Sequence, residues 1–319
     1  MRRLLGGAAF AALLVGALFA VGPREPVDLT PRFDPASLPA DLDAWLAQRE
    51  AAVAPSVAER ILWAGVPGAM TDIAVVYLHG FSATSEEIRP VPDRVAQALG
   101  ANLMFVRLAG HGQGPAAMAG PTVQDWIDDT ARALTIGRRI GRKVLVIATS
   151  TGGTLAAEAA RSDLGRDIDA LVLISPNFAI QNPAAVILTW PLARYWGPVV
   201  AGRERCFAPV NDAQAQFWTT CYPTAAVFPM AALADHAAQG DYAAATMPML
   251  RITDAADQVV APAASAAVAA RWGGAVTDLP VTLGPGDDPW HHVLAGDILS
   301  PSQTAPVTQA IVDWARANL

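Results

Sequence analysis

The stretch Val144-Leu-Val-Ile-Ala-Thr-Ser-Thr-Gly-Gly153 decides the fold. It begins as a continuous apolar run, reaches Ser150, and continues through two glycines into a helical pattern over 151–162. A serine at a sharp strand-to-helix turn has its hydroxyl exposed at the end of the strand. The stretch therefore predicts a nucleophile elbow with Ser150 as its nucleophile.

The neighbours of Ser150 have the sizes that such a turn requires. The turn holds the serine in a strained backbone conformation, so the residues two positions away on either side must be small. Ala148 and Gly152 occupy these positions, with alanine in place of the more usual first glycine. A small-x-Ser-x-Gly pattern also arises at ordinary strand-to-helix turns. The elbow therefore needs support from an oxyanion-binding loop, a base and an acid elsewhere in the chain.

Similar apolar runs recur on both sides of the elbow and predict the sheet. Runs of four to six apolar residues without strict alternation are typical of strands buried on both faces of a parallel sheet. Helical patterns lie between them, and this alternation predicts an α/β fold with a mostly parallel, doubly wound sheet. We expect strands at 73–78, 103–108, 144–148, 171–174 and 249–253, and a sixth at 281–283. We expect helices at 41–53, 85–99, 122–140, 151–162, 262–271 and 305–318.

One interval is too long for a single crossover helix. About 70 residues separate Ile174 from Met249, and they include Trp190, Tyr222 and Phe228 among other aromatic residues. We interpret 178–247 as a cap inserted into the core. The expected core then consists of residues 41–177 and 248–319, preceded by a Pro-rich linker at 23–40.

A second loop is suited to binding an oxyanion. His79-Gly80-Phe81 directly follows the strand expected at 73–78. With an elbow at Ser150, the backbone N–H groups of Phe81 and Thr151 are the expected oxyanion donors. We expect the His79 side chain to brace this loop.

A serine hydroxyl needs a general base, and the chain has five histidines. His291 and His292 alone follow the last expected strand, as the order serine, acid, histidine demands. Order alone leaves both open. His292, which two apolar residues follow, is favoured by the family resemblance described below, and His291 remains the alternative.

The acid is expected in the loop after the strand at 249–253. Asp254 and Asp257 both lie there, and Asp257 is followed within a few residues by Val259, Val260 and Pro262. We favour Asp257, with Asp254 as the alternative. Such an acid orients the imidazole and stabilises its charged form without taking the proton itself.

Together these segments resemble the α/β-hydrolase superfamily, especially its monoacylglycerol-lipase and lysophospholipase-like serine esterases. The resemblance covers about residues 60–319. It rests on His79-Gly80-Phe81, Leu108-Ala-Gly-His-Gly112, the Ser150 elbow, Asp257 and His292. It implies an α/β-hydrolase fold with an inserted cap and a catalytic triad of Ser150, Asp257 and His292. Superfamily members that cleave carbon–halogen bonds or epoxides have aspartate at the elbow, so Ser150 argues against both activities.

The resemblance implies ester hydrolysis through an acyl-enzyme, without a metal or organic cofactor. A lysophospholipid or monoacylglycerol is the expected substrate, since the cap is aromatic and an exported enzyme meets lipids. Acyl transfer to another acceptor, amide hydrolysis by the same triad, and an inactive binding protein of this fold are the alternatives. With a net charge of -7 and no basic run, we expect no nucleic-acid partner.

The N-terminus predicts export. Arg2 and Arg3 precede an apolar run over 4–22. Residues 1–22 are therefore expected to be either a cleaved signal peptide or a signal anchor, because the run is just long enough to span a bilayer. The protein would then lie in the cell envelope, either membrane-anchored or periplasmic or secreted, with membrane contact through 4–22.

Cys206 and Cys221 are the only cysteines. In an oxidising compartment we expect them to form a disulfide, which would close a loop of about 15 residues and contribute on the order of 3 kcal/mol. The alternative is two free thiols that pack as small apolar groups.

Overall fold

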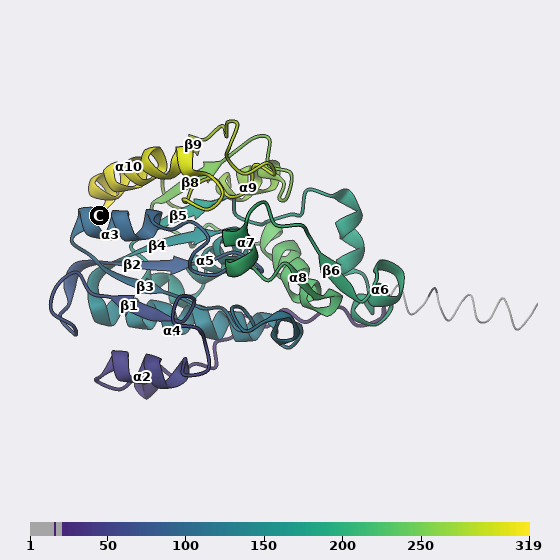
Figure 1. Cartoon of the computed structure of the whole chain (residues 1–319), viewed down its shortest axis with the longest axis horizontal. Helices are drawn as coiled ribbons and strands as arrows, with labels where there is room; N and C mark the ends of the chain where they lie inside the picture. The colour runs from purple at the N-terminus through teal and green to yellow at the C-terminus, as the bar shows by residue number, and fades with distance from the viewer. Residues whose placement is uncertain (1–15, 17–20) are drawn as a thin grey trace, which may run out of the picture.

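A computed structural model describes residue 16 and residues 21–319, and its centre is a seven-stranded sheet (Figure 1). The strand order is β1-β3-β2-β4-β5-β8-β9, and β1 pairs antiparallel with β3 while every other neighbouring pair is parallel. This confirms the predicted α/β class and the mostly parallel sheet. The strands are β1 (Arg60–Leu62), β2 (Thr71–Leu78), β3 (Asn102–Phe105), β4 (Gly141–Thr149), β5 (Ala170–Ile174), β8 (Met249–Thr253) and β9 (Val276–Pro280).

Helices cover both faces of the sheet. The core helices are α2 (Leu42–Arg49), α3 (Val91–Leu99), α4 (Val123–Ile140), α5 (Thr151–Ala160), α9 (Pro262–Ala269) and α10 (Pro301–Asn318). Short 3-10 turns are η1 (Pro35–Ser37), η2 (Pro115–Ala119) and η3 (Asp163–Asp167). In Figure 1, α3 and α10 lie on one side of the sheet and α4 lies on the other, with α2 beyond it.

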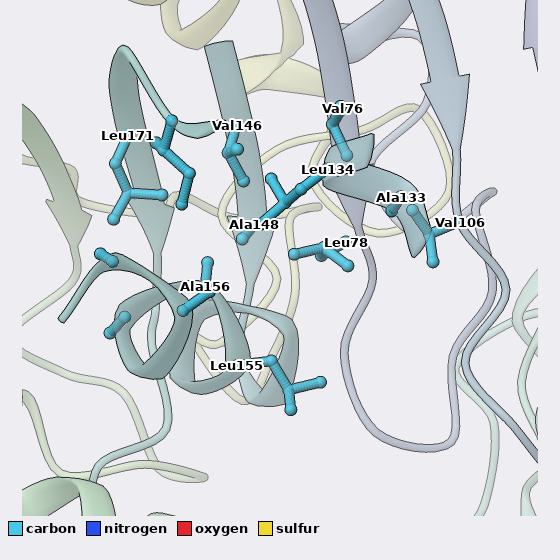
Figure 2. Packing of buried hydrophobic residues seen from close by; sticks show 14 of the residues in the cluster. Val76, Leu78, Val106, Ala133, Leu134, Val146, Ala148, Leu155, Ala156 and Leu171 are labelled. Atoms are coloured by element: carbon cyan, nitrogen blue, oxygen red, sulfur yellow. The ribbon is translucent and has the colours of Figure 1, made fainter. Parts of the chain in front are cut away.

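Alternating residues of each strand supply two separate cores. Val76, Leu78, Val146 and Ala148 face α4 and α5, where they meet Leu134 and Leu155, among others (Figure 2). Val75, Tyr77, Leu145 and Ile147 face α3 and α10 instead. Because both faces are buried, the central strands read as continuous apolar runs. The strand ends that carry the candidate site therefore continue from strands that are packed on both faces.

Segment 178–247 contains short elements outside the main sheet. They are η4 (Pro183–Thr189), α6 (Ala193–Ala201), β6 (Glu204–Cys206), α7 (Asp212–Phe217), β7 (Cys221–Pro223), η5 (Thr224–Ala226) and α8 (Val227–Ala238). β6 and β7 form a separate two-stranded antiparallel sheet. We refer to these residues as the cap.

The sixth strand was predicted in the wrong place. The strand is β9 at Val276–Pro280, and Val281 and Leu283 follow it as buried loop residues. β9 is an edge strand with mostly exposed or half-exposed side chains, so it needs no apolar run, whereas Val281 and Leu283 pack into the core without ladder pairing. β1 was missed because it is a three-residue edge strand beginning at Arg60.

Several other element boundaries also differ from the expected ranges, among them those of β3 and α3. β3 ends at Phe105 instead of 108, because the loop that follows carries the buried residues Val106 and Leu108. The helix expected at 85–99 begins only at Val91, with Pro92 in its first turn, where a missing N–H costs nothing.

The chain between 23 and 40 runs along the folded domain. Arg32 binds Asp125 and Asp128 of α4 through its guanidinium, at 2.7 Å in each case. Gln124 Nε2 donates to Asp28 and to the carbonyl of Thr30. This segment is thus attached to α4 at several points.

The predicted export segment falls mostly outside the described residues. Residues 1–15 and 17–20 are not described, and this range includes most of the apolar run at 4–22. Among residue 16 and residues 21–319, no helix combines the length and apolarity needed to cross a bilayer.

Candidate active site

Ser150 lies at the sharp turn between β4 and α5. Its backbone has φ 51° and ψ -118°, a strained conformation that non-glycine residues rarely adopt. Its N–H donates to Ile174 O at 3.0 Å, so the neighbouring strand β5 fixes the turn. The predicted elbow geometry is therefore present at Ser150.

Histidine and aspartate side chains line up behind this serine. His292 Nε2 lies 3.0 Å from Ser150 Oγ, and His292 Nδ1 lies 2.9 Å from Asp257 Oδ2. All three residues are buried. Each of the three residues is at most 9% exposed. Bulk water therefore has little access to the hydrogen bonds between them.

Loop backbone fixes the acid and the base. Asp257 Oδ1 accepts from the N–H groups of Val259 and Val260, at 2.8 and 2.9 Å, which leaves Oδ2 for the imidazole. Asp288 Oδ2 accepts from the backbone N–H groups of His292 and Val293. The side chain of Asp257 and the backbone at His292 are thus each held by hydrogen bonds within their own loops.

The charges around His292 favour its protonated form. Burial alone would lower the pKa of His292, but the hydrogen bond to Asp257 and the negative charges of Asp257, Glu87 and Asp288 raise it above the ordinary value. A base with a raised pKa readily accepts a proton from a hydroxyl.

The two alternative residues form a pair of their own. His291 Nδ1 lies 2.8 Å from Asp254 Oδ2, and His291 has a positive φ of 56°. Asp254 also accepts from the N–H groups of Ala256 and Leu283. This pair joins the acid loop to the histidine loop, and the structure places His292, and not His291, against Ser150.

The loop after β2 lies beside the elbow. A Cβ built on Gly80 would lie 3.1 Å from Ser150 Cβ, so the backbone at 80 passes very close to the nucleophile. Thr151 is the first residue of α5, where backbone N–H groups have no intrahelical acceptor. Phe81 and Thr151 thus belong to the two segments that flank Ser150.

His79 braces this loop, as expected from the sequence. Its Nδ1 lies 2.8 Å from Gly80 O, and Leu108 N–H donates to its Nε2 at 3.1 Å. Burial lowers the pKa of His79 to about 3, so the ring is neutral near pH 7. His79 joins the loops after β2 and β3.

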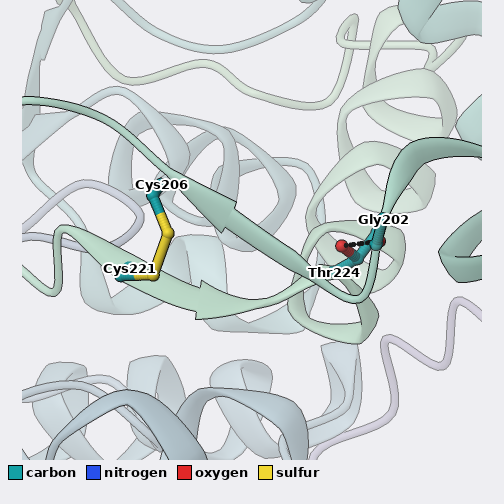
Figure 3. Close-up of a disulfide and its surroundings, with 4 residues drawn as sticks. All are labelled: Gly202, Cys206, Cys221 and Thr224. Atoms are coloured by element: carbon teal, nitrogen blue, oxygen red, sulfur yellow. Dashed lines mark hydrogen bonds between the residues drawn. A yellow bond between two sulfur atoms is a disulfide. The ribbon is translucent and has the colours of Figure 1, made fainter.

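The cap reaches the same loop through the β6–β7 hairpin. The Tyr222 ring lies edge-on to Phe81, with a centroid distance of 5.3 Å, and Thr219 N–H donates to Ser82 O at 2.7 Å. Cys206 and Cys221 form a disulfide across this hairpin (Figure 3). Tyr222 therefore follows directly after a cross-linked residue.

Within the described residues, the one group of three clustered metal-ligating side chains is Glu204 with these two cysteines, whose sulfurs are bonded to each other.

Fold and site together define an α/β hydrolase. Residues 70–284 match the family Hydrolase_4, described as serine aminopeptidase, S33, and the chain belongs to this family. No curated protein matches it by sequence.

Solved structures of similar fold include three lipolytic enzymes. One comes from work on LipS and LipT, two metagenome-derived lipolytic enzymes (TM-score 0.67, 19% identity, 83% of this chain and 99% of that chain). A second is the monoacylglycerol lipase of Paleococcus ferrophilus (TM-score 0.57, 15% identity, 82% of this chain and 99% of that chain). A third is a soluble variant of monoglyceride lipase from Saccharomyces cerevisiae, bound to a substrate analogue (TM-score 0.59, 10% identity, 82% of this chain and 91% of that chain). At these identities the likeness concerns the fold.

Sequence reasoning missed two acidic residues at the site. Asp288 lies four positions before His292, and Glu87 lies seven positions after Gly80 in a segment that was expected to be helical. Neither belongs to a motif. Asp288 had one sequence signal, its place in the loop that carries His291 and His292, whereas Glu87 had none.

Proposed function

We propose that this protein is a serine hydrolase that cleaves carboxylic esters through an acyl-enzyme. The observation that carries the proposal is the alignment of Ser150, His292 and Asp257, with hydrogen-bond distances of 3.0 and 2.9 Å at a strained elbow. A nucleophile, a base and a residue that orients the base are the requirements of acyl transfer by serine.

The first half-reaction forms the acyl-enzyme. Ser150 Oγ attacks the ester carbonyl carbon while His292 Nε2 takes the hydroxyl proton. The carbonyl oxygen becomes an oxyanion, and the N–H groups of Phe81 and Thr151 donate to it. Asp257 stabilises the imidazolium. The tetrahedral intermediate then collapses, and the leaving alkoxide takes the proton from His292.

The second half-reaction restores the enzyme. Water loses a proton to His292 and attacks the acyl carbon. When the second intermediate collapses, Ser150 Oγ takes that proton back, and the carboxylic acid is released. The cycle consumes one water and yields one alcohol and one acid, and it needs no cofactor.

For the substrate, we propose an ester with an apolar acyl chain, such as a lysophospholipid or monoacylglycerol. Tyr222 of the cap packs on Phe81, and Trp218, a buried cap residue, directly precedes Thr219, whose N–H donates to Ser82 O. Apolar side chains of the cap thus lie close to the loop after β2 at 79–82, here called the oxyanion loop. Neighbours of the same fold include a monoacylglycerol lipase and a monoglyceride lipase. A series of 4-nitrophenyl esters from acetate to palmitate tests this. We expect kcat/KM to rise with chain length, and a flat profile would remove the lipid substrate.

Amide hydrolysis is the second candidate, because the family model is described as a serine aminopeptidase. The same triad would serve, with His292 protonating an amine in place of an alkoxide. The kcat/KM values for an ester and an anilide of the same acyl group distinguish the two functions. We expect the ester to react faster, and a faster anilide would assign the protein to the peptidases.

We propose that the protein is exported and contacts a membrane through residues 4–22. Residues 23–25 are bound to the cap near α6. Pro23 O accepts from Leu192 N–H at 2.7 Å, and Arg194 Nε donates to Glu25 at 2.8 Å. Tyr195, Val199 and Val200 of α6 are at least 72% exposed next to this attachment. An exposed apolar face beside Pro23 and Glu25, two residues that closely follow the apolar run in sequence, suits contact with a lipid surface.

Proximity to lipid tests this contact in the full chain. Both native cysteines are paired, so a bimane fluorophore on Val199→Cys would report from one site. The control is Val66→Cys, an equally exposed valine in the loop before β2, at the opposite end of the sheet from Ser150. In vesicles with brominated lipids we expect quenching at 199 and not at 66. Equal quenching at both sites, or none, would argue against membrane contact by this face.

A further inference from the structure

Glu87 is a buried carboxylate next to the site that the proposed mechanism does not use. It is 2% exposed and lies in the segment between β2 and α3. Among residues 21–319, no arginine or lysine forms a salt bridge with it. Its carboxylate accepts its hydrogen bonds from a backbone N–H and a phenol instead. A charged group buried in this way is costly, so its contacts indicate a specific role.

The first contact holds the oxyanion loop. Gly80 N–H donates to Glu87 Oε2 at 2.8 Å. A Cβ built on Gly80 would lie 2.6 Å from Glu87 Oε1 and 3.1 Å from Ser150 Cβ. The side of Gly80 on which a Cβ would lie therefore faces both the Glu87 carboxylate and the nucleophile, and leaves no room for a side chain. Phe81 is the next residue, so a change at Glu87 moves the segment that carries its N–H.

The second contact leads to the elbow. Tyr77 Oη donates to Glu87 Oε2 at 2.9 Å and lies 3.2 Å from Thr149 Oγ1. Thr149 is the last residue of β4 and directly precedes Ser150. One carboxylate thus connects the loop after β2 with the strand that ends at the nucleophile.

We propose that Glu87 is a positioning residue that fixes the oxyanion loop through the hydrogen bond from Gly80 N–H, and that its carboxylate, which lies on the same side of Gly80 as Ser150, adds a negative charge near the Ser150–His292 pair. The proposal rests on the proposed function, since it assigns Glu87 a part in that reaction. The charge would stabilise the imidazolium form of His292 that exists while the oxyanion is bound.

The electrostatics of the site agree with this arrangement. Burial raises the pKa of Glu87, against the hydrogen bonds from Gly80 and Tyr77 and the attraction of His292. Around His292, burial lowers the pKa, whereas Asp257, Glu87 and Asp288 all raise it, and the net shift is upward. Removing the charge at 87 leaves Asp257 and Asp288 in place, so the pKa of His292 should fall.

The test is an NMR titration of the His292 ring in the full chain, which needs no substrate. Glu87→Gln removes the charge and keeps an acceptor for Gly80. Glu86→Gln is the matched control, because its carboxylate binds Arg60 and Arg89 away from the nucleophile. We expect the His292 pKa to be lower in E87Q than in the wild type and unchanged in E86Q. An unchanged value in folded E87Q would overturn the electrostatic role.

Glu87→Asp tests the contact with Gly80 separately, because it keeps the charge but is one methylene too short to reach the N–H. With a 4-nitrophenyl ester, we expect kcat to fall about tenfold or more, with KM within about twofold, because only the oxyanion loop is displaced. Unchanged kcat in E87D would overturn the positioning role.

Different measurements show whether the role of Glu87 or the proposed hydrolase function fails. If the wild type hydrolysed no ester or amide, the proposed function would fail, and the NMR titration would still decide whether Glu87 acts on His292. If the wild type is active, the acid limb of its kcat/KM profile should move to lower pH in E87Q, and this limb reports the base of the free enzyme. A merely structural Glu87 would lower activity without moving that limb.

Discussion

Gly152 lies directly against the carbonyl oxygen of Leu78, the last residue of β2. A Cβ at position 152 would be 2.3 Å from Leu78 O and 2.6 Å from His79 O. Both oxygens are backbone atoms at the start of the oxyanion loop, so a side chain there cannot be accommodated by rotating a neighbour. The sequence requirement for glycine two residues after the nucleophile is thus a requirement for contact between the elbow and the loop after β2.

Gly152→Ala should therefore damage both stability and activity. We expect a loss of about 1–3 kcal/mol in the free energy of unfolding, as for other overpacked sites. We also expect kcat to fall at least tenfold, because the elbow and the oxyanion loop must separate. Gly65→Ala is the control, since a Cβ there meets nothing within 4 Å. Urea unfolding and ester hydrolysis measure the two effects, and wild-type behaviour of G152A would refute this account of the elbow.

The adjacent histidines should differ sharply in importance. His292→Ala removes the group 3.0 Å from Ser150 Oγ and should lower kcat by about 10⁴ or more. His291→Ala breaks only the pair with Asp254, and we expect kcat within about tenfold of the wild type with some loss of stability. Steady-state kinetics of both variants decide this. A larger loss in H291A than in H292A would exchange their roles.

Activity should depend on pH through His292. The ring accepts a proton only when neutral, and its pKa is raised above the ordinary value of 6.5, so activity should be lost as pH falls through a midpoint above 6.5. Asp257→Asn removes the hydrogen-bonded charge, and the remaining activity should have its acid limb at lower pH. A pH profile of kcat/KM checks both statements, and a midpoint below 6.5 in the wild type would conflict with this charge arrangement.

The disulfide should stabilise the cap contact with the oxyanion loop. Cys206 and Cys221 close a loop of 15 residues, for which the chain-entropy model gives about 3 kcal/mol. We expect dithiothreitol to lower the Tm of the wild type and to lower its activity, because Tyr222 follows Cys221 and packs on Phe81. The Cys206→Ser/Cys221→Ser double variant should show the lower Tm without reductant and no further response to it. If the reductant changes the double variant equally, the disulfide is not the cause.

The sequence predicted the elements whose side chains are buried on both faces. Apolar runs mark β2, β4, β5 and β8 because most of the side chains of these strands are buried in one or the other of the two cores. Edge strands have no such requirement, which is why β1 was missed and β9 was placed at 281–283. His292 and Asp257 were chosen from the order of the triad residues together with the family resemblance, and in the structure His292 contacts both Asp257 and Ser150.

Contacts between loops could not be predicted in this way. Glu87 reaches Gly80 because the segment before α3 folds back over the end of β2, and no local pattern encodes that path. Asp288 binds the backbone of its own loop, which requires a turn conformation that spacing does not specify. The pairing of His291 with Asp254 likewise depends on the positive φ at 291.

Labelling of the purified chain by a fluorophosphonate, followed by mass-spectrometric mapping of the modified residue, tests directly whether Ser150 is the nucleophile. We expect one modification, at Ser150, with none in Ser150→Ala and a strongly reduced rate in His292→Ala. A folded wild-type protein that remains unlabelled, or that is labelled at a different serine, would contradict the assignment of Ser150 as an activated nucleophile.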